Sequence, residues 1–135
     1  MNKEALKRIF EFLENKAEHN APFKWKILNN EPITEEDLNV KGDLNLRSSE
    51  INSLPEGLKV GGNLVLNWSN ITSLPEGLEV GGDLQVRNCK NLKSLPKGLK
   101  VDGDLYIYGT PINEIEDNDE ILEMIKPGYI KGDIY

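Results

Sequence analysis

From residue 40 onward the chain repeats one arrangement of apolar and polar positions. Three stretches follow one another directly, VKGDLNLRSSEINSLPEGLK, VGGNLVLNWSNITSLPEGLE and VGGDLQVRNCKNLKSLPKGLK, and a fourth copy begins with VDGDLYIYGTPINEIED. The same position holds Leu44, Leu64, Leu84 and Leu105, with spacings of 20, 20 and 21 residues. A unit of this length cannot bury its apolar face alone, so the period predicts a solenoid in which neighbouring units stack.

Each unit contains a short alternating segment such as Leu64-Val65-Leu66. Alternation predicts a strand with every second side chain inward, and stacked strands predict a parallel sheet with a spacing of about 4.8 Å. Later apolar positions predict two more inward layers: Ile51, Ile71, Leu92 and Ile112, then Leu54, Leu74, Leu95 and Ile115. The phrase S-L-P-E-G-L predicts a turn, because proline fixes φ and glycine accepts a positive φ.

The repeat resembles the leucine-rich repeat family, whose consensus is L-x-x-L-x-L-x-x-N/C-x-L. The second copy reads L-x-L-x-x-S-x-I, and the Asn/Cys position holds Ser49, Ser69, Cys89 and Thr110 in successive copies. The third copy is one residue longer after Cys89, which matches the C-x-x-L variant of the consensus. The first consensus leucine is replaced by Lys41, Gly61, Gly81 and Asp102, so a flatter β-solenoid stays open beside the curved horseshoe.

Two phrases add narrower resemblances. SLPEGL is similar to the short repeats of secreted bacterial ubiquitin-ligase effectors, although no stretch resembles the catalytic domain of those proteins. KPGYIKGDIY is similar to the endings of small bacteriophage and prophage repeat proteins. This second resemblance implies a host-directed role, such as inhibition of a bacterial nuclease or immune enzyme.

The segments that flank the repeats have the patterns of caps. Residues 3–18 carry an apolar stripe at helical spacing, formed by Leu6, Ile9, Phe10 and Leu13. We expect Pro22 to end that helix, Phe23 to Ile27 to form an edge strand with Trp25 in the cap core, and Thr34-x-x-Asp37 to start a helical turn. Beyond the repeats, Asp117-x-x-Glu120 predicts a helix that ends before Pro127-Gly128. Ile130 and Ile134 then predict a last strand.

The predicted fold is therefore an α+β solenoid with a parallel sheet, short turns on the return side and a helical cap at each end. Residues 1–37 form the N-terminal helical cap with its edge strand. Residues 38–116 form the leucine-rich-like repeats, and residues 117–135 form the C-terminal cap helix and the final strand.

Composition and charge exclude several classes of function. The 135 residues include 16 basic and 23 acidic ones, a net charge of −7, which disfavours direct binding to nucleic acid. No stretch has the length and apolarity of a membrane span, and the charged start argues against a signal peptide. We therefore expect a cytoplasmic protein, in the host cytoplasm if a phage encodes it. One cysteine and one histidine make no metal cluster, and no glycine pair precedes a phosphate-binding Lys-Ser/Thr, so no metal or cofactor is expected.

The residues between the inward leucines must point outward, where repeat proteins commonly bind partners. We predict a non-enzymatic protein-binding module whose contact residues are Arg47, Asn67, Trp68, Gln85, Arg87, Tyr106, Tyr108 and Tyr135. Exposed aromatics and arginines of this kind dominate many interfaces. The alternative is an acidic decoy that mimics a nucleic acid through the C-terminal run Glu114 to Glu123. The outward column of Asp and Asn beside the strands is predicted to cap its own turns and not to bind a metal.

Overall fold

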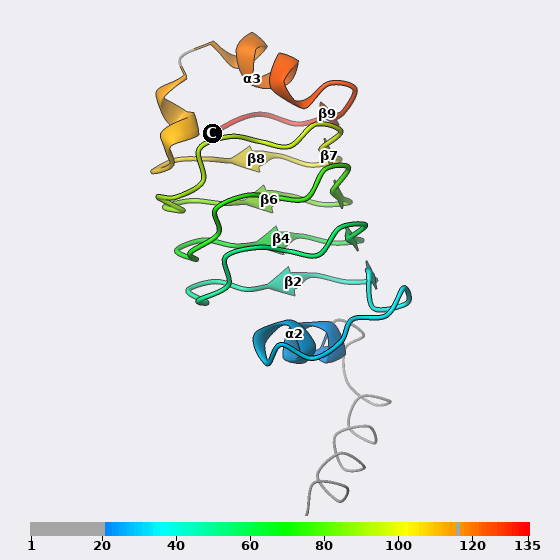
Figure 1. Cartoon of the computed structure of the whole chain (residues 1–135). Helices are drawn as coiled ribbons and strands as arrows, with labels where there is room; N and C mark the ends of the chain where they lie inside the picture. The colour runs from blue at the N-terminus through cyan, green and yellow to red at the C-terminus, as the bar shows by residue number, and fades with distance from the viewer. Residues whose placement is uncertain (1–20, 116) are drawn as a thin grey trace, which may run out of the picture.

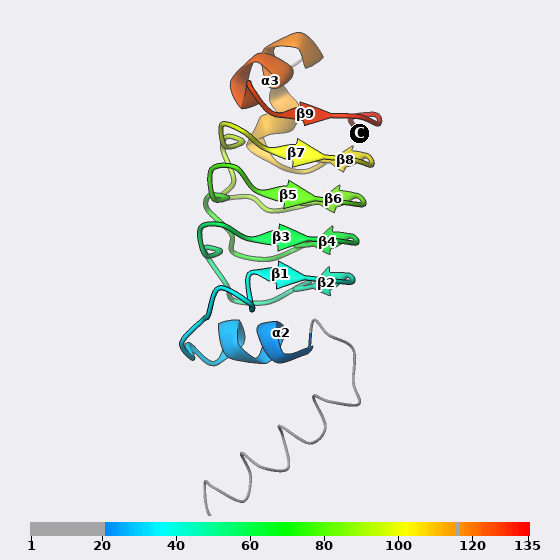
Figure 2. The same ribbon diagram turned by 90° about the vertical axis from the view of Figure 1, so that its right-hand side faces the viewer.

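The computed structural model of the chain describes residues 21–115 and 117–135 and shows a β-solenoid (Figure 1). Its elements in chain order are α2 (Ala21–Leu28), β1 (Asn39–Val40), β2 (Leu44–Asn45), β3 (Lys59–Val60), β4 (Leu64–Val65), β5 (Glu79–Val80), β6 (Leu84–Gln85), β7 (Lys100–Val101), β8 (Leu105–Tyr106), the 3-10 helix η1 (Pro111–Glu114), α3 (Asn118–Ile125) and β9 (Tyr129–Ile130). The coils stack in a straight column and do not curve into a horseshoe (Figure 2). The flatter of the two expected architectures is therefore the observed one.

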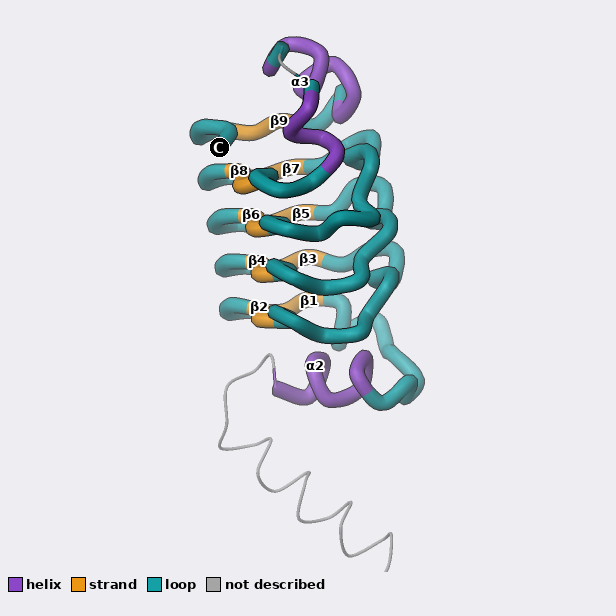
Figure 3. The backbone as a smooth tube through the Cα atoms, turned by 90° about the vertical axis from the view of Figure 1, so that its left-hand side faces the viewer, coloured by secondary structure: helices purple, strands orange, loops and turns teal. Residues whose placement is uncertain are grey.

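Each coil contributes two short strands, which belong to two parallel sheets. Sheet A has the order β1-β3-β5-β7-β9, and sheet B has the order β2-β4-β6-β8. The register repeats the sequence period, since Leu44 pairs with Leu64, Leu64 with Leu84, and Leu84 with Leu105. The sequence pattern predicted one strand in each coil, whereas the structure has two, which are joined by a sharp bend (Figure 3). The second strand exists because Val40, Val60, Val80 and Val101 also point inward and pair in register.

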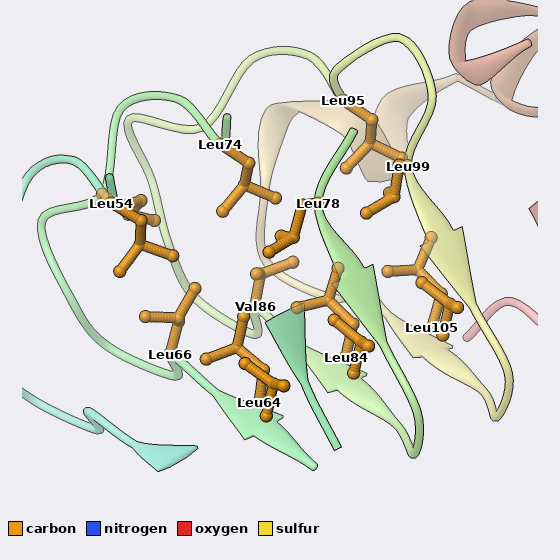
Figure 4. Packing of buried hydrophobic residues seen from close by; sticks show 14 of the residues in the cluster. Leu54, Leu64, Leu66, Leu74, Leu78, Leu84, Val86, Leu95, Leu99 and Leu105 are labelled. Atoms are coloured by element: carbon orange, nitrogen blue, oxygen red, sulfur yellow. The ribbon is translucent and has the colours of Figure 1, made fainter. Parts of the chain in front are cut away.

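The core is a set of stacked columns, one for each inward position of the coil (Figure 4). Leu44, Leu64, Leu84 and Leu105 are all 0% exposed, which confirms the predicted leucine column. The turn phrase adds a column that the sequence interpretation did not name, formed by the fully buried Leu58, Leu78 and Leu99. Burial of an apolar side chain of this size contributes about 1.5–3 kcal/mol, so these columns hold the stack together.

The glycine that precedes each Asp or Asn is explained by the spacing between coils. A Cβ on Gly82 would collide with Asn63 Oδ1 of the coil before it, and a Cβ on Gly103 would collide with Asp83 Oδ1. The same crowding applies at Gly62 and Gly132. Glycine is required here because the Asp or Asn side chain of one coil occupies the space that a Cβ at the glycine of the next coil would need.

The N-terminal end departs from the predicted pattern. Residues 3–18, with the expected helix, lie outside the described residues. Phe23 to Ile27 belong to helix α2 and not to an edge strand, and Pro22 lies in the first turn of that helix, where its missing N–H costs nothing. Phe23 is 2% exposed whereas Trp25 is 41% exposed, so Trp25 is not a core residue.

The link between α2 and β1 is held by one carboxylate. Asp37 Oδ2 accepts a hydrogen bond from the Thr34 N–H at 2.9 Å and pairs with Lys26 Nζ at 2.7 Å. The Asp37 N–H in turn donates to Thr34 Oγ1, so the expected capping turn is present. Burial opposes the charged form of Asp37, but the bonds from Lys26 and Thr34 outweigh it and lower the pKa of this carboxyl.

The C-terminal end follows its pattern closely. The Asp117 side chain caps α3 by accepting from the Asp119 N–H at 2.8 Å, and Ile121 and Ile125 of α3 are buried. Strand β9 pairs with β7, and Ile134 forms an isolated bridge with Leu105, so the predicted last strand is confirmed. In Figure 1, α3 lies at the β9 end of the stack and α2 at the opposite end.

Candidate interaction surface

The outward side of sheet B presents two columns of side chains and one corner position, which we call face B. The first column holds Asn45, Val65, Gln85, Tyr106 and Tyr135, and the second holds Arg47, Asn67, Arg87 and Tyr108. The corner position that follows the second column holds Ser48, Trp68, Asn88 and Gly109. The contact residues predicted from the sequence therefore all come from one side of the solenoid, although the side chain of Asn67 is buried there.

Three of these side chains form a stacked row along the column axis. The guanidinium carbon of Arg87 lies 4.2 Å from the centre of the Tyr106 ring, which is a cation–π contact. On its other side, Tyr106 stacks on Tyr135 with 5.1 Å between ring centroids and 16° between planes. Each side chain restricts its neighbour, so the row meets a partner with little rotamer entropy left to lose.

Trp68 and Tyr108 extend the aromatic area beside this row. Trp68 is 53% exposed and Tyr108 is 67% exposed, and Tyr135 in the row is 53% exposed. Within the described part of the chain, neither Trp68 nor Tyr108 makes a side-chain hydrogen bond or ring contact. Their rings are therefore open to solvent on a rigid frame.

The backbone at Trp68 is unusual for a residue of this size. All four corner residues have a positive φ: 57° at Ser48, 64° at Trp68, 59° at Asn88 and 80° at Gly109. Glycine and asparagine adopt this left-handed conformation readily, whereas for a bulky side chain it is strained. The backbone at this corner thus favours glycine or asparagine, and its conformation gives no reason for tryptophan.

Asn67 is a predicted contact residue that the structure removes from the surface. It is 8% exposed, and its Oδ1 accepts from the Arg87 N–H at 2.8 Å while its Nδ2 donates to Gln85 Oε1 at 3.0 Å. Strand alternation places the residue outward, but these two bonds turn its side chain against the next coil. Asn67 positions Arg87 and Gln85, which are half-buried, and Arg47 is exposed at the other end of its column.

The outward Asp and Asn column works differently from the expectation that each residue caps its own turn. Each side chain accepts instead from a backbone N–H of the next coil. Asn63 N–H donates to Asp43, Asp83 N–H to Asn63, Asp104 N–H to Asp83 and Asp133 N–H to Asp104, all at 2.7–2.8 Å. Asn serves as well as Asp, as the sequence interpretation argued. Among the described residues no group of three or more His, Cys, Asp or Glu side chains is placed to hold a metal ion.

Cys89 lies in the buried ladder of small side chains and not in a reactive site. Its Sγ donates to the Leu66 carbonyl at 3.0 Å and contacts Ser69 Oγ at 3.6 Å. Burial is the main cause that raises the pKa of this thiol, which keeps it protonated near neutral pH. Cys89 is therefore a packing element of the core, beside Ser69 of the preceding coil.

The outward side of sheet A, which meets sheet B at the bend of each coil (Figure 3), has a different chemistry. A shallow groove of about 460 Å³ runs across it, floored by Gly61 and Gly81. Glu79 lies between two lysines there, at 3.4 Å from Lys59 Nζ and 3.6 Å from Lys100 Nζ. These pairs are solvent-exposed and contribute little to stability. The groove has no exposed aromatic cluster comparable with that of face B.

No family model matches the chain, and neither a curated protein nor a solved structure matches it. Across the described ranges, none of the helices has the length and apolar character needed to cross a membrane.

Proposed function

We propose that the protein is a non-enzymatic binding module that docks a protein partner on face B. The observation that carries this proposal is Trp68, which exposes half of a large apolar side chain from a strained left-handed corner. Strain that the fold does not need is found at functional sites. Around this residue, the row of Arg87, Tyr106 and Tyr135 and the exposed Tyr108 supply the residue types that concentrate binding energy in interfaces.

The return turns support the same choice of face by contrast. The three turn phrases SLPEGL, SLPEGL and SLPKGL are nearly identical, so they offer little with which to recognise one partner among many. The outward positions of face B differ at every coil, and their aromatic content rises toward β8. The bonds of Asn67 to the next coil support a rigid presentation of that surface.

The 20-residue period and the buried ladder of Cys89 support a relationship to leucine-rich repeats, and the positions of α2 and α3 beyond the two ends of the stack support a capping role for both. The phage-like phrase KPGYIKGDIY supports an inhibitor of a bacterial host or immune enzyme. A bacterial lysate is therefore the right source of the partner.

The test is differential capture. The immobilised protein, a Tyr106→Ala/Tyr108→Ala variant and a turn variant, Glu56→Ala/Glu76→Ala/Lys97→Ala, are exposed to the same bacterial lysate, and bound proteins are identified by mass spectrometry. The proposal expects a protein that the wild type and the turn variant retain and the double tyrosine variant loses. If the turn variant loses the captured protein and the double tyrosine variant retains it, the partner binds the return turns and the proposal is wrong. Thermal melts of all three proteins show that the comparison is between folded molecules.

A further inference from the structure

The outward sides of the two sheets carry opposite charge, although the chain as a whole is acidic. Face B together with the adjoining Asp and Asn column has four aspartates against two arginines, a net charge of −2. The aspartates are Asp43, Asp83, Asp104 and Asp133, and the arginines are Arg47 and Arg87. The outward side of sheet A has four lysines against one glutamate and one aspartate, a net charge of +2. The aromatic surface is thus the acidic one.

The aspartates are fixed in place and keep one oxygen each for a ligand. Each of Asp43, Asp83 and Asp104 uses Oδ1 to accept a backbone N–H of the next coil at 2.7–2.8 Å. None of the three makes an ion pair with any residue that the structure describes. Their second oxygens therefore form a column of acceptors one coil apart, held by the backbone of the stack.

The ring of Tyr135 lies within the field of this column. Asp133 Oδ2 accepts from the Tyr135 hydroxyl at 3.4 Å, so the carboxylate and the ring share one side of the coil. The charges of Asp133 and then Asp104 raise the pKa of Tyr135. Tyr106 already holds one guanidinium, that of Arg87, over its face. Ring faces beside carboxylates are a favourable environment for cations, because the ring quadrupole and the anionic charge attract the same group.

We propose that face B recognises an extended partner segment that carries arginine or lysine, with its cations between the aspartate column and the aromatic rings. This inference rests on the proposed function and names the chemistry of the partner. Charge complementarity selects the occupant, because an acidic segment would meet four carboxylates and a purely apolar one would bury them without a counter-charge.

The column itself supplies the matched variants. Asn63 accepts the Asp83 N–H at 2.8 Å as the aspartates do elsewhere, so Asp→Asn removes a charge and keeps the ladder bond. Asp83→Asn/Asp104→Asn removes two charges from face B, and Asn63→Asp adds one. Asp102→Asn removes a charge from the outward side of sheet A, and Glu120→Gln/Glu123→Gln removes two from α3. The last two variants are controls for general electrostatic attraction.

The probe is a fluorescein-labelled peptide of alternating arginine and serine, compared by fluorescence anisotropy with the same peptide in which citrulline, the uncharged analogue, replaces arginine. We expect the arginine peptide to bind at least ten times more tightly. Asp83→Asn/Asp104→Asn should weaken it at least fivefold, Asn63→Asp should strengthen it, and Asp102→Asn and the α3 variant should leave it within twofold. Equal binding of both peptides, or equal binding by wild type and Asp83→Asn/Asp104→Asn, overturns the inference. A larger loss in the α3 variant also overturns it, because the acidic C-terminal helix would then be the site.

Failure of this inference is distinguishable from failure of the proposed function. If the peptide ignores the aspartates while the capture experiment still depends on Tyr106 and Tyr108, face B binds a partner of different chemistry. If neither peptide binding nor partner capture depends on face B, both the proposed function and the inference about a basic partner segment are wrong.

Discussion

Replacement of Trp68 by asparagine should affect partner binding much more than stability. The replacement loses apolar packing, which lowers stability, but it also relieves backbone strain, which raises stability. Trp68 is 53% exposed, so about half of its surface packs on the solenoid. Loss of roughly 100 Å² of apolar contact at about 25 cal/mol per Å² costs about 2.5 kcal/mol, which is an upper estimate. Relief of the left-handed backbone, where Asn88 already stands in the next coil, returns about 1–2 kcal/mol.

The expected result is therefore a loss of at most about 1.5 kcal/mol in the free energy of unfolding, measured by urea denaturation followed by circular dichroism. Binding of the captured partner should fall more than tenfold, as for a central aromatic contact. Trp25→Phe is the matched control, since Trp25 is also partly exposed but belongs to α2 and not to face B. A loss of 3 kcal/mol or more would make Trp68 a structural residue, and unchanged binding would remove it from the interface.

Three further predictions concern the frame that presents face B. Leu84→Ala should lower the free energy of unfolding by about 2–5 kcal/mol, because Leu84 is 0% exposed in the middle of the leucine column; a loss below about 0.5 kcal/mol would contradict its burial. Asp83→Ala should cost about 1–2 kcal/mol in urea denaturation, because the Asp104 N–H loses its acceptor at 2.7 Å, whereas Asp83→Asn should cost less than about 0.5 kcal/mol; equal losses would refute the ladder. Asp37→Asn should lower the melting temperature at neutral pH and make the melting temperature less dependent on pH in the acid range. The pKa of Asp37 is lower in the folded than in the unfolded protein. The stabilisation by Asp37 is therefore complete above about pH 4 and disappears as the pH falls through the lowered pKa. A wild-type profile that Asp37→Asn leaves unchanged would show that the Lys26 pair contributes nothing.

The repeat period made the solenoid predictable, because equivalent residues of successive repeats pair in register across neighbouring coils. The pairs are Leu44 with Leu64, Leu64 with Leu84, and Leu84 with Leu105. The second strand of each coil was not predicted. A single inward valine before a glycine turn is too short a pattern to indicate a strand, and it pairs only because the neighbouring coils supply identical segments. The register of the stack, and not local propensity, makes sheet A.

The error at Phe23 to Ile27 has a similar origin. Phe-Lys-Trp-Lys-Ile alternates as a strand would, yet Phe23 and Ile27 are also one helical turn apart. The helix prevails because it buries Phe23 and lets Trp25 reach solvent, where its side chain is 41% exposed. Alternation over five residues does not decide between the two periods.

Most of the candidate surface followed from the alternation in sheet B, but two features required the structure. Asn67 reads as an outward contact residue, and only the bonds to Arg87 and Gln85 show it to be buried. The positive φ of Trp68 is also invisible in the sequence, although the equivalent residues Asn88 and Gly109 are types that tolerate it. A comparison of residue types across the corner column could have raised the question.

The chain has two tryptophans, one on face B and one in α2, so a single spectrum can test the central claim. In a ¹⁵N–¹H correlation spectrum each indole N–H gives its own resonance, assigned with Trp25→Phe. Addition of the partner recovered by capture should shift or broaden the Trp68 resonance and leave that of Trp25 in place. A shift confined to Trp25, or no change at Trp68 when the partner is saturating, would contradict docking on face B.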